Sequence, residues 1–132
     1  MSGFSAGGAP QLGTNRLLWS LIGANMNTTA DQAFAKAFGF STFQIERIRV
    51  VNASTSLTLA AGGIYGGAGK TVTLVAAGQL YSGLTGGTLG LDLTALPLIL
   101  GNQSLAALYL SLTLGQGAPA TADFYVYGWG LT

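Results

Sequence analysis

Few residues of this chain could carry out acid–base or nucleophilic chemistry. Its 132 residues include no histidine and no cysteine, which excludes imidazole and thiolate metal sites, disulfide bridges, cysteine nucleophiles and serine–histidine relays. The four carboxylates, Asp31, Glu46, Asp92 and Asp123, are scattered along the sequence. Glycoside hydrolysis needs two carboxylates about 5–10 Å apart across a cleft, and no local motif supports such a pair. We therefore expect a non-enzymatic protein with no catalytic, cofactor-binding or metal site and no small-molecule substrate.

One glycine-rich segment matches half of a phosphate-binding loop. Residues 66–71 read Gly-Gly-Ala-Gly-Lys-Thr, but the motif needs another glycine five residues before Gly69, where the chain has Ile64. The segment also lies between two predicted strands, whereas a phosphate loop must lead into a helix. The pattern therefore favours a β-hairpin loop.

Charged residues are rare in this sequence. They make up 7% of the chain and leave a net charge of +1, whereas ordinary soluble domains carry about 25%. Such a surface is either that of a monomer coated with uncharged polar residues or that of a subunit in a permanent assembly, where interfaces are depleted of charge. We favour the assembly. The low net charge also argues against nucleic-acid binding.

The sequence does not predict a membrane segment, although 49% of its residues are hydrophobic. The longest uncharged run, between Asp92 and Asp123, is interrupted by Pro97 and Gly101, so it is too broken for a spanning helix of about 20 residues. Residues 108–114 alternate with the period of a half-buried strand. No basic leader precedes an apolar stretch near Met1, and we expect a chain that is used without secretion.

Short strands separated by glycine-rich turns dominate the predicted structure. This pattern predicts an all-β chain with a single antiparallel β-sandwich of jelly-roll or Greek-key type over residues 15–132. Residues 1–14 are rich in glycine and are expected to form an extended arm that could span up to about 45 Å. Strands are expected at 43–52, 56–65, 71–76, 89–93, 105–114 and 122–129, with Leu57 and Leu59 on one face of the second. Residues 16–22 are expected to form a strand or a short helix, and residues 30–38 a strand in preference to a helix. A short strand is expected at 79–81, and the segment 96–100 is ambiguous.

The segment 43–52 is the strongest predicted strand because it is rich in β-branched residues and bounded by turns. Its alternation slips after Glu46, so that Ile45 would share a face with Arg47 while Ile48 would point the other way. A β-bulge would repair this pattern, and so would a strand covered on both faces.

Two groups of side chains are candidate contacts with a partner. Arg47 and Arg49 point to the same side of a regular strand, where they either pair with a cross-strand carboxylate such as Asp31 or Asp123 or meet an acidic patch on a partner. Aromatic residues on one face of the last strand could stack on a sugar or a protein, although a cross-strand aromatic cluster is favoured. The full set of candidate contacts, including those of the arm, is Phe4, Leu12, Arg16, Arg47, Arg49, Tyr125, Tyr127 and Trp129.

Five segments carry a resemblance to a known group of proteins. They are Asn25-Met26-Asn27-Thr28-Thr29-Ala30-Asp31-Gln32-Ala33, Arg47-Ile48-Arg49-Val50-Val51-Asn52-Ala53-Ser54, Leu57-Thr58-Leu59-Ala60-Ala61-Gly62-Gly63-Ile64-Tyr65, Tyr109-Leu110-Ser111-Leu112-Thr113 and Ala120-Thr121-Ala122-Asp123. In their residue pattern and in the order of these segments, residues 25–132 resemble small Ala/Thr/Gly-rich virion structural proteins of tailed bacteriophages and prophages. No functional residue is carried over, because the group has no defining site.

The resemblance implies a structural subunit of a virion. Similar small β-sandwich proteins serve as capsid decoration, or cement, proteins that clamp neighbouring major-capsid subunits as dimers or trimers. We therefore expect a location on the capsid exterior after synthesis in the host bacterial cytoplasm, with the major capsid protein and copies of this chain as partners. The alternatives are a tail, neck or fibre-attachment subunit, and a glycan- or host-surface-binding module that uses Tyr65 or the aromatic residues of the last strand.

Overall fold

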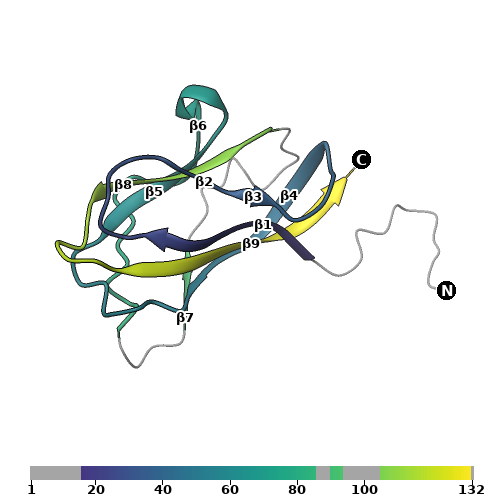
Figure 1. Cartoon of the computed structure of the whole chain (residues 1–132). Coiled ribbons are helices and arrows are strands. Elements are labelled where there is room, and N and C mark those ends of the chain that lie inside the picture. The colour runs from purple at the N-terminus through teal and green to yellow at the C-terminus, as the bar shows by residue number, and fades with distance from the viewer. Residues whose placement is uncertain (1–15, 86–89, 94–104, 132) are drawn as a thin grey trace.

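The computed structural model describes residues 16–85, 90–93 and 105–131, which form two antiparallel sheets and contain no α-helix. The sheets have the strand orders β3-β1-β9-β4-β7 and β2-β8-β5-β6 and lie one above the other in Figure 1. The chain is therefore an all-β sandwich, which confirms the predicted fold class. Its elements are β1 (Arg16–Asn25), β2 (Gln32–Ala33), β3 (Ala35–Lys36), β4 (Thr42–Val51), β5 (Ala61–Gly66), the short 3-10 helix η1 (Ala68–Lys70), β6 (Val72–Val75), β7 (Gly90–Leu93), β8 (Leu108–Leu114) and β9 (Thr121–Leu131).

Some predicted features lie outside the described residues. They include the extended arm at 1–14 and the ambiguous segment at 96–100. The jelly-roll or Greek-key topology stays a prediction, because residues 94–104, which connect β7 to β8, are among those not described. Within the described ranges, no helix has the length and apolar character that a helical membrane crossing requires.

Strand β9 is the middle strand of the five-stranded sheet and pairs with β1 on one side and β4 on the other. Phe124 and Val126 are fully buried, while Tyr125 and Tyr127 between and beside them are half-buried. This alternation places the two apolar side chains in the core and the tyrosines on the outer surface, as the period of a strand requires. The predicted faces of the last strand are confirmed.

Strand β4 contains the bulge that its sequence predicts. The pairing with β9 shifts between Ile45 and Arg47, so Glu46 has no partner of its own in the register. The extra residue restores the alternation, and Ile45 and Ile48 are both buried although three positions separate them. The bulge therefore turns the arginines of this strand to the outer surface.

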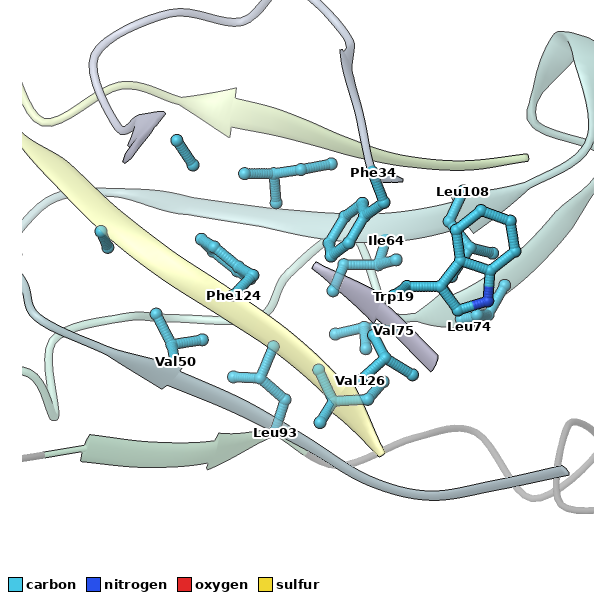
Figure 2. Packing of buried hydrophobic residues seen from close by; sticks show 14 of the residues in the cluster. Trp19, Phe34, Val50, Ile64, Leu74, Val75, Leu93, Leu108, Phe124 and Val126 are labelled. Carbon is cyan, nitrogen blue, oxygen red and sulfur yellow. The ribbon is translucent and has the colours of Figure 1, made fainter. Parts of the chain in front are cut away.

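The core between the sheets contains edge-to-face aromatic contacts, and Figure 2 shows Phe34 and Phe124 there among aliphatic side chains. The ring of Phe124 lies 6.1 Å from that of Phe34 and 5.7 Å from that of Tyr81. Trp19 packs against Phe40 with ring centroids 5.7 Å apart. These centroid distances are in the range that favours aromatic pairs. The apolar faces of both sheets thus meet in one continuous core.

The strand expected at 56–65 is shorter than predicted, because it begins only at Ala61. Leu57 is fully buried, whereas Leu59, expected on the same face, is 55% exposed. The side-chain oxygen of Gln116 accepts the backbone N–H of Leu59 at 2.9 Å. The Leu59 N–H is therefore bonded to a side chain and not to a neighbouring strand. Because this segment is not a strand, Leu57 and Leu59 do not share a face as the alternation predicted.

The first predicted strand is longer than expected. Strand β1 continues beyond residue 22 to Asn25 through a bulge at Gly23, where φ is +66°. The backbone N–H of Gly23 donates to the carboxylate of Asp123 at 2.7 Å, so the glycine expected to end the strand lies within the sheet.

The segment 30–38 forms strands, as expected, but in two pieces. Strand β2 joins one sheet and β3 joins the other, and the buried Phe34 lies between them. The strands expected at 71–76, 89–93, 105–114 and 122–129 are β6, β7, β8 and β9, with their ends shifted. Instead of a strand at 79–81, the chain forms an isolated bridge between Leu80 and Ala61.

Candidate functional site

The outer face of the five-stranded sheet brings together four of the predicted contact residues. In the register of β4 and β9, Arg47 lies opposite Tyr127 and Arg49 lies opposite Tyr125. Side chains directly opposite each other on one face of an antiparallel pair are close neighbours. We call these four residues the arginine–tyrosine face. Each tyrosine is half-buried, and the side chain of Arg49 is 30% exposed.

A single carboxylate holds both arginines of this face. Oδ1 of Asp92 on β7 lies 2.9 Å from Nη1 of Arg49 and 3.2 Å from Nε of Arg47. The hydrogen bond from Arg49, assisted by the one from Arg47, lowers the pKa of Asp92. Two guanidinium groups against one carboxylate leave this cluster with one net positive charge.

The predicted pairing of these arginines with a cross-strand carboxylate is confirmed, but Asp31 and Asp123, the carboxylates named for it, are engaged elsewhere. Asp31 pairs with Lys70 on the other sheet, with Nζ and Oδ1 3.2 Å apart. Asp123 accepts a hydrogen bond from the side-chain amide of Asn52 at 2.9 Å, in addition to the one from β1. The actual partner, Asp92, comes from a short strand that lies beside β4. Nothing in the local sequence indicates that pairing.

The two tyrosines form a pair of rings along the outer face of β9. Their centroids are 6.3 Å apart and their planes are inclined by 35°. Desolvation raises the pKa of Tyr125, and the negative charge of Asp123 and the neighbouring Tyr127 raise it further. The Tyr125 phenol is therefore neutral at neutral pH, and the two rings together present an amphipathic surface beside the arginines.

The other predicted contact residues do not join this arrangement. The guanidinium of Arg16 lies over the ring of Phe38, 3.8 Å from its centroid, which is a cation–π contact within the chain. Trp129 lies opposite Gln44, at the far end of the outer row on β9. The remaining two, in the arm, are outside the described residues.

A second polar cluster lies on the four-stranded sheet and was not found from the sequence. Nζ of Lys70 lies 3.2 Å from Oδ1 of Asp31 and donates to Oγ of Ser111 at 3.3 Å, beside the ring of Tyr65. Hydrogen bonds from Ser111 and Lys70 lower the pKa of Asp31. Its members are far apart in sequence, so no local spacing could have revealed them.

This cluster does not have the chemistry of a serine–lysine dyad. The lysine of such a dyad accepts a proton from the serine, whereas Lys70 donates to the Ser111 hydroxyl and forms an ion pair with Asp31. The cluster ties the loop after β5 to the segment before β2. That loop joins two antiparallel strands, β5 and β6, as the sequence predicted when it favoured a hairpin over a phosphate-binding loop.

Among the described residues, no three carboxylates, histidines or cysteines come together in a way that could hold a metal ion. Comparison of the chain with protein families, with curated proteins and with solved structures finds no match.

Proposed function

We propose that this protein is a non-enzymatic structural subunit of a bacteriophage virion, and specifically a capsid decoration protein. In this proposal it binds the assembled major-capsid lattice through the arginine–tyrosine face. The observation that carries the proposal is the composition of that face, in which the paired tyrosines lie beside two arginines that share one carboxylate. Tyrosine and arginine are the residues enriched at protein interfaces and among their energetic hot spots.

The electrostatics of the face indicate the kind of surface it would meet. The guanidinium groups of Arg47 and Arg49 outnumber their shared carboxylate, Asp92, so this part of the face favours a carboxylate on the partner. Beside it, Asp123 adds a negative charge next to Tyr125. Because Arg49 is largely covered and already hydrogen-bonded, its guanidinium is held in place before binding, and little side-chain entropy is lost on docking.

A decoration protein needs no chemistry of its own. A subunit that binds the assembled shell but not the free capsid protein stabilises the shell by mass action. Contacts repeated over a lattice add avidity, so that each interface can be small. A compact β-sandwich with a charge-poor surface fits this role, and the resemblance of residues 25–132 to phage virion proteins points in the same direction.

The first test is the copy number of the chain in purified particles, measured by quantitative mass spectrometry. A decoration protein should be present in hundreds of copies, in simple ratio to the major shell protein. A count of tens or fewer would instead support the alternative of a tail, neck or fibre-attachment subunit. Absence from particles would overturn the virion proposal.

The second test locates the binding surface. Tyr127→Ala should weaken binding to undecorated capsids at least about tenfold, because truncating a central interface tyrosine removes hot-spot energy. The matched control is Tyr109→Ala, since Tyr109 is also half-buried but belongs to the other sheet. Equal affinity of the two variants would contradict the assignment of the arginine–tyrosine face.

The paired rings of Tyr125 and Tyr127 also support a second candidate function, binding of glycans by stacking. Their inclined arrangement, 6.3 Å apart, offers two amphipathic surfaces for the apolar faces of sugar rings. This alternative predicts that the isolated protein binds glycans and that Trp129→Ala weakens the binding. Capsid binding without glycan binding would dismiss it.

A further inference from the structure

A patch of exposed leucines lies at one end of the four-stranded sheet. Leu59, Leu80 and Leu114 are 55%, 61% and 53% exposed, and we call them the leucine patch. Leu114 and Leu80 are the neighbours of Ala61 on its two sides in the sheet. Leu114 and Leu80 therefore flank Ala61, and Leu59 precedes Ala61 by two residues in the chain.

The backbone around the patch is firmly held. Gln116 accepts N–H groups from Leu59 at 2.9 Å and from Ala60 at 3.1 Å. Next to Leu80, the buried Tyr81 donates its hydroxyl hydrogen to the carbonyl oxygen of Gly62 at 3.0 Å. These hydrogen bonds hold the backbone next to Leu59 and Leu80, so the exposure of these side chains is a property of the folded structure.

The size of the patch indicates what can cover it. Three half-exposed leucines make at most a few hundred Å² of apolar surface, the largest patch that a typical monomer shows. A stable contact between two folded domains buries about 800 Å² on each. The patch is too small to hold two domains face to face, and its size suits one large side chain of a short linear segment.

We infer that the leucine patch receives the N-terminal segment of a second copy of this chain, with Phe4 as the anchoring side chain. Residues 1–15 lie outside the described residues, carry no charged side chain and contain only Phe4 and Leu12 as large apolar residues beyond the initial methionine. An uncharged segment with one aromatic residue complements an uncharged patch that seats one ring.

The position of the leucine patch favours binding of the N-terminal segment of a neighbouring copy over binding of the N-terminal segment of the same chain. The first described residue, Arg16, begins β1, which ends at Asn25. Gln116, which accepts the N–H of Leu59, donates its own N–H to the carbonyl oxygen of Met26, so the patch lies beyond the far end of β1. Figure 1 shows the course of that strand. Ten strand residues separate the two ends by about 30 Å. Twelve residues, the length from Phe4 to Arg16, reach at most about 40 Å even when fully extended. Capture by the same domain would use most of that reach to pass along β1 and round to the other sheet, whereas a neighbour placed end to end presents its patch closer to the segment.

Such a contact is heterologous, since the donor end of one copy meets the acceptor end of the next. Heterologous contacts close into rings when the rotation between copies permits. The inference deepens the proposed function by naming the surface through which copies join. Self-association can be measured without capsids, so its failure and the failure of capsid binding are separate results.

The test is a complementation experiment with the full chain, using sedimentation equilibrium to measure mass. The wild type should associate to a multiple of its 13.4 kDa chain mass. Phe4→Ser disables the donor, and Leu80→Ser with Leu114→Ser disables the acceptor, so each variant alone should associate at least about tenfold more weakly. An equimolar mixture retains one intact donor and one intact acceptor and should form a heterodimer of twice the chain mass.

The control is Ile22→Ser, because Ile22 is equally exposed, at 60%, but lies on the other sheet. It should associate as the wild type does. If the double leucine variant fails to fold, Leu114→Ser alone serves as the acceptor variant. A monomeric wild type, normal association of Phe4→Ser, or a mixture that stays monomeric would each overturn the inference.

Discussion

Tyr81 offers a substitution that removes one buried hydrogen bond without changing the packing around it. The side chain is fully buried, its hydroxyl donates to the carbonyl oxygen of Gly62 at 3.0 Å, and its ring packs against Phe124. Tyr81→Phe keeps the ring and deletes the hydroxyl. A buried hydrogen bond contributes about 0.5–1.5 kcal/mol net, and an acceptor left without its donor costs about 1–3 kcal/mol. We therefore expect the free energy of unfolding to fall by about 1.5 kcal/mol.

Urea unfolding followed by tryptophan fluorescence measures this loss. With an m-value of about 2 kcal/mol/M, a loss of 1.5 kcal/mol lowers the midpoint by about 0.7 M. The matched control is Tyr125→Phe, which removes a hydroxyl from the outer surface and should change stability by less than about 0.5 kcal/mol. A midpoint shift below about 0.2 M for Tyr81→Phe, or equal shifts for the two variants, would refute the reasoning.

Three further predictions concern the core, the central pair of strands and the ion pairs of Asp92. Phe124→Ala should cost about 3–5 kcal/mol in urea unfolding, because the ring is fully buried between the sheets; a loss under about 1 kcal/mol would mean that the core collapses around the gap. Gly128→Ala should cost at least about 2 kcal/mol, because its Cβ would overlap the backbone oxygen of Gln44, while Gly78→Ala, which meets nothing within 4 Å, should be nearly neutral. Because the pKa of Asp92 is lowered in the folded chain, its stabilising effect is complete above its unfolded pKa of about 3.9 and is lost as the pH falls through the folded value. The difference in unfolding free energy between the wild type and Asp92→Asn should therefore shrink as the pH falls from 5 to 2, and a difference independent of pH would contradict the ion pair.

The features that the sequence predicted well are those encoded within one strand. The slip in alternation after Glu46 indicated either a bulge or a strand covered on both faces. The bulge is present, because the alternating apolar residues on both sides of Glu46 can all reach the core only if one extra residue is inserted. The alternation in β9 likewise separated Tyr125 and Tyr127 from Phe124 and Val126. Both predictions use the two-residue period of a strand, which depends on local geometry alone.

The features that the sequence could not predict depend on which strands become neighbours. Asp92 holds the arginines because β7 pairs with β4, although more than forty residues separate them. The exposure of Leu59 depends on Gln116, which reaches back from beyond β8. The local alternation predicted that Leu59 shares a face with Leu57, which is buried. The exposure of Leu59, and with it the leucine patch, could therefore not be predicted from the sequence.

The rarity of charge acquires a clearer meaning once the charged side chains are placed. Their interactions within the chain are ion pairs, cation–π contacts or hydrogen bonds. The charged residues of the chain are Arg16, Lys36, Arg47, Arg49, Lys70, Asp31, Glu46, Asp92 and Asp123. Charges that keep proteins apart are numerous and of uncompensated sign at the surface. Here they are few and serve to fasten strands and loops to one another. Electrostatic repulsion between copies is therefore weak, and the uncharged patches can determine how the molecules associate. This use of charge is consistent with the proposed role as a subunit of an assembly. It leaves the arginine–tyrosine face and the leucine patch, which lie on different sheets, as separate candidate surfaces for association.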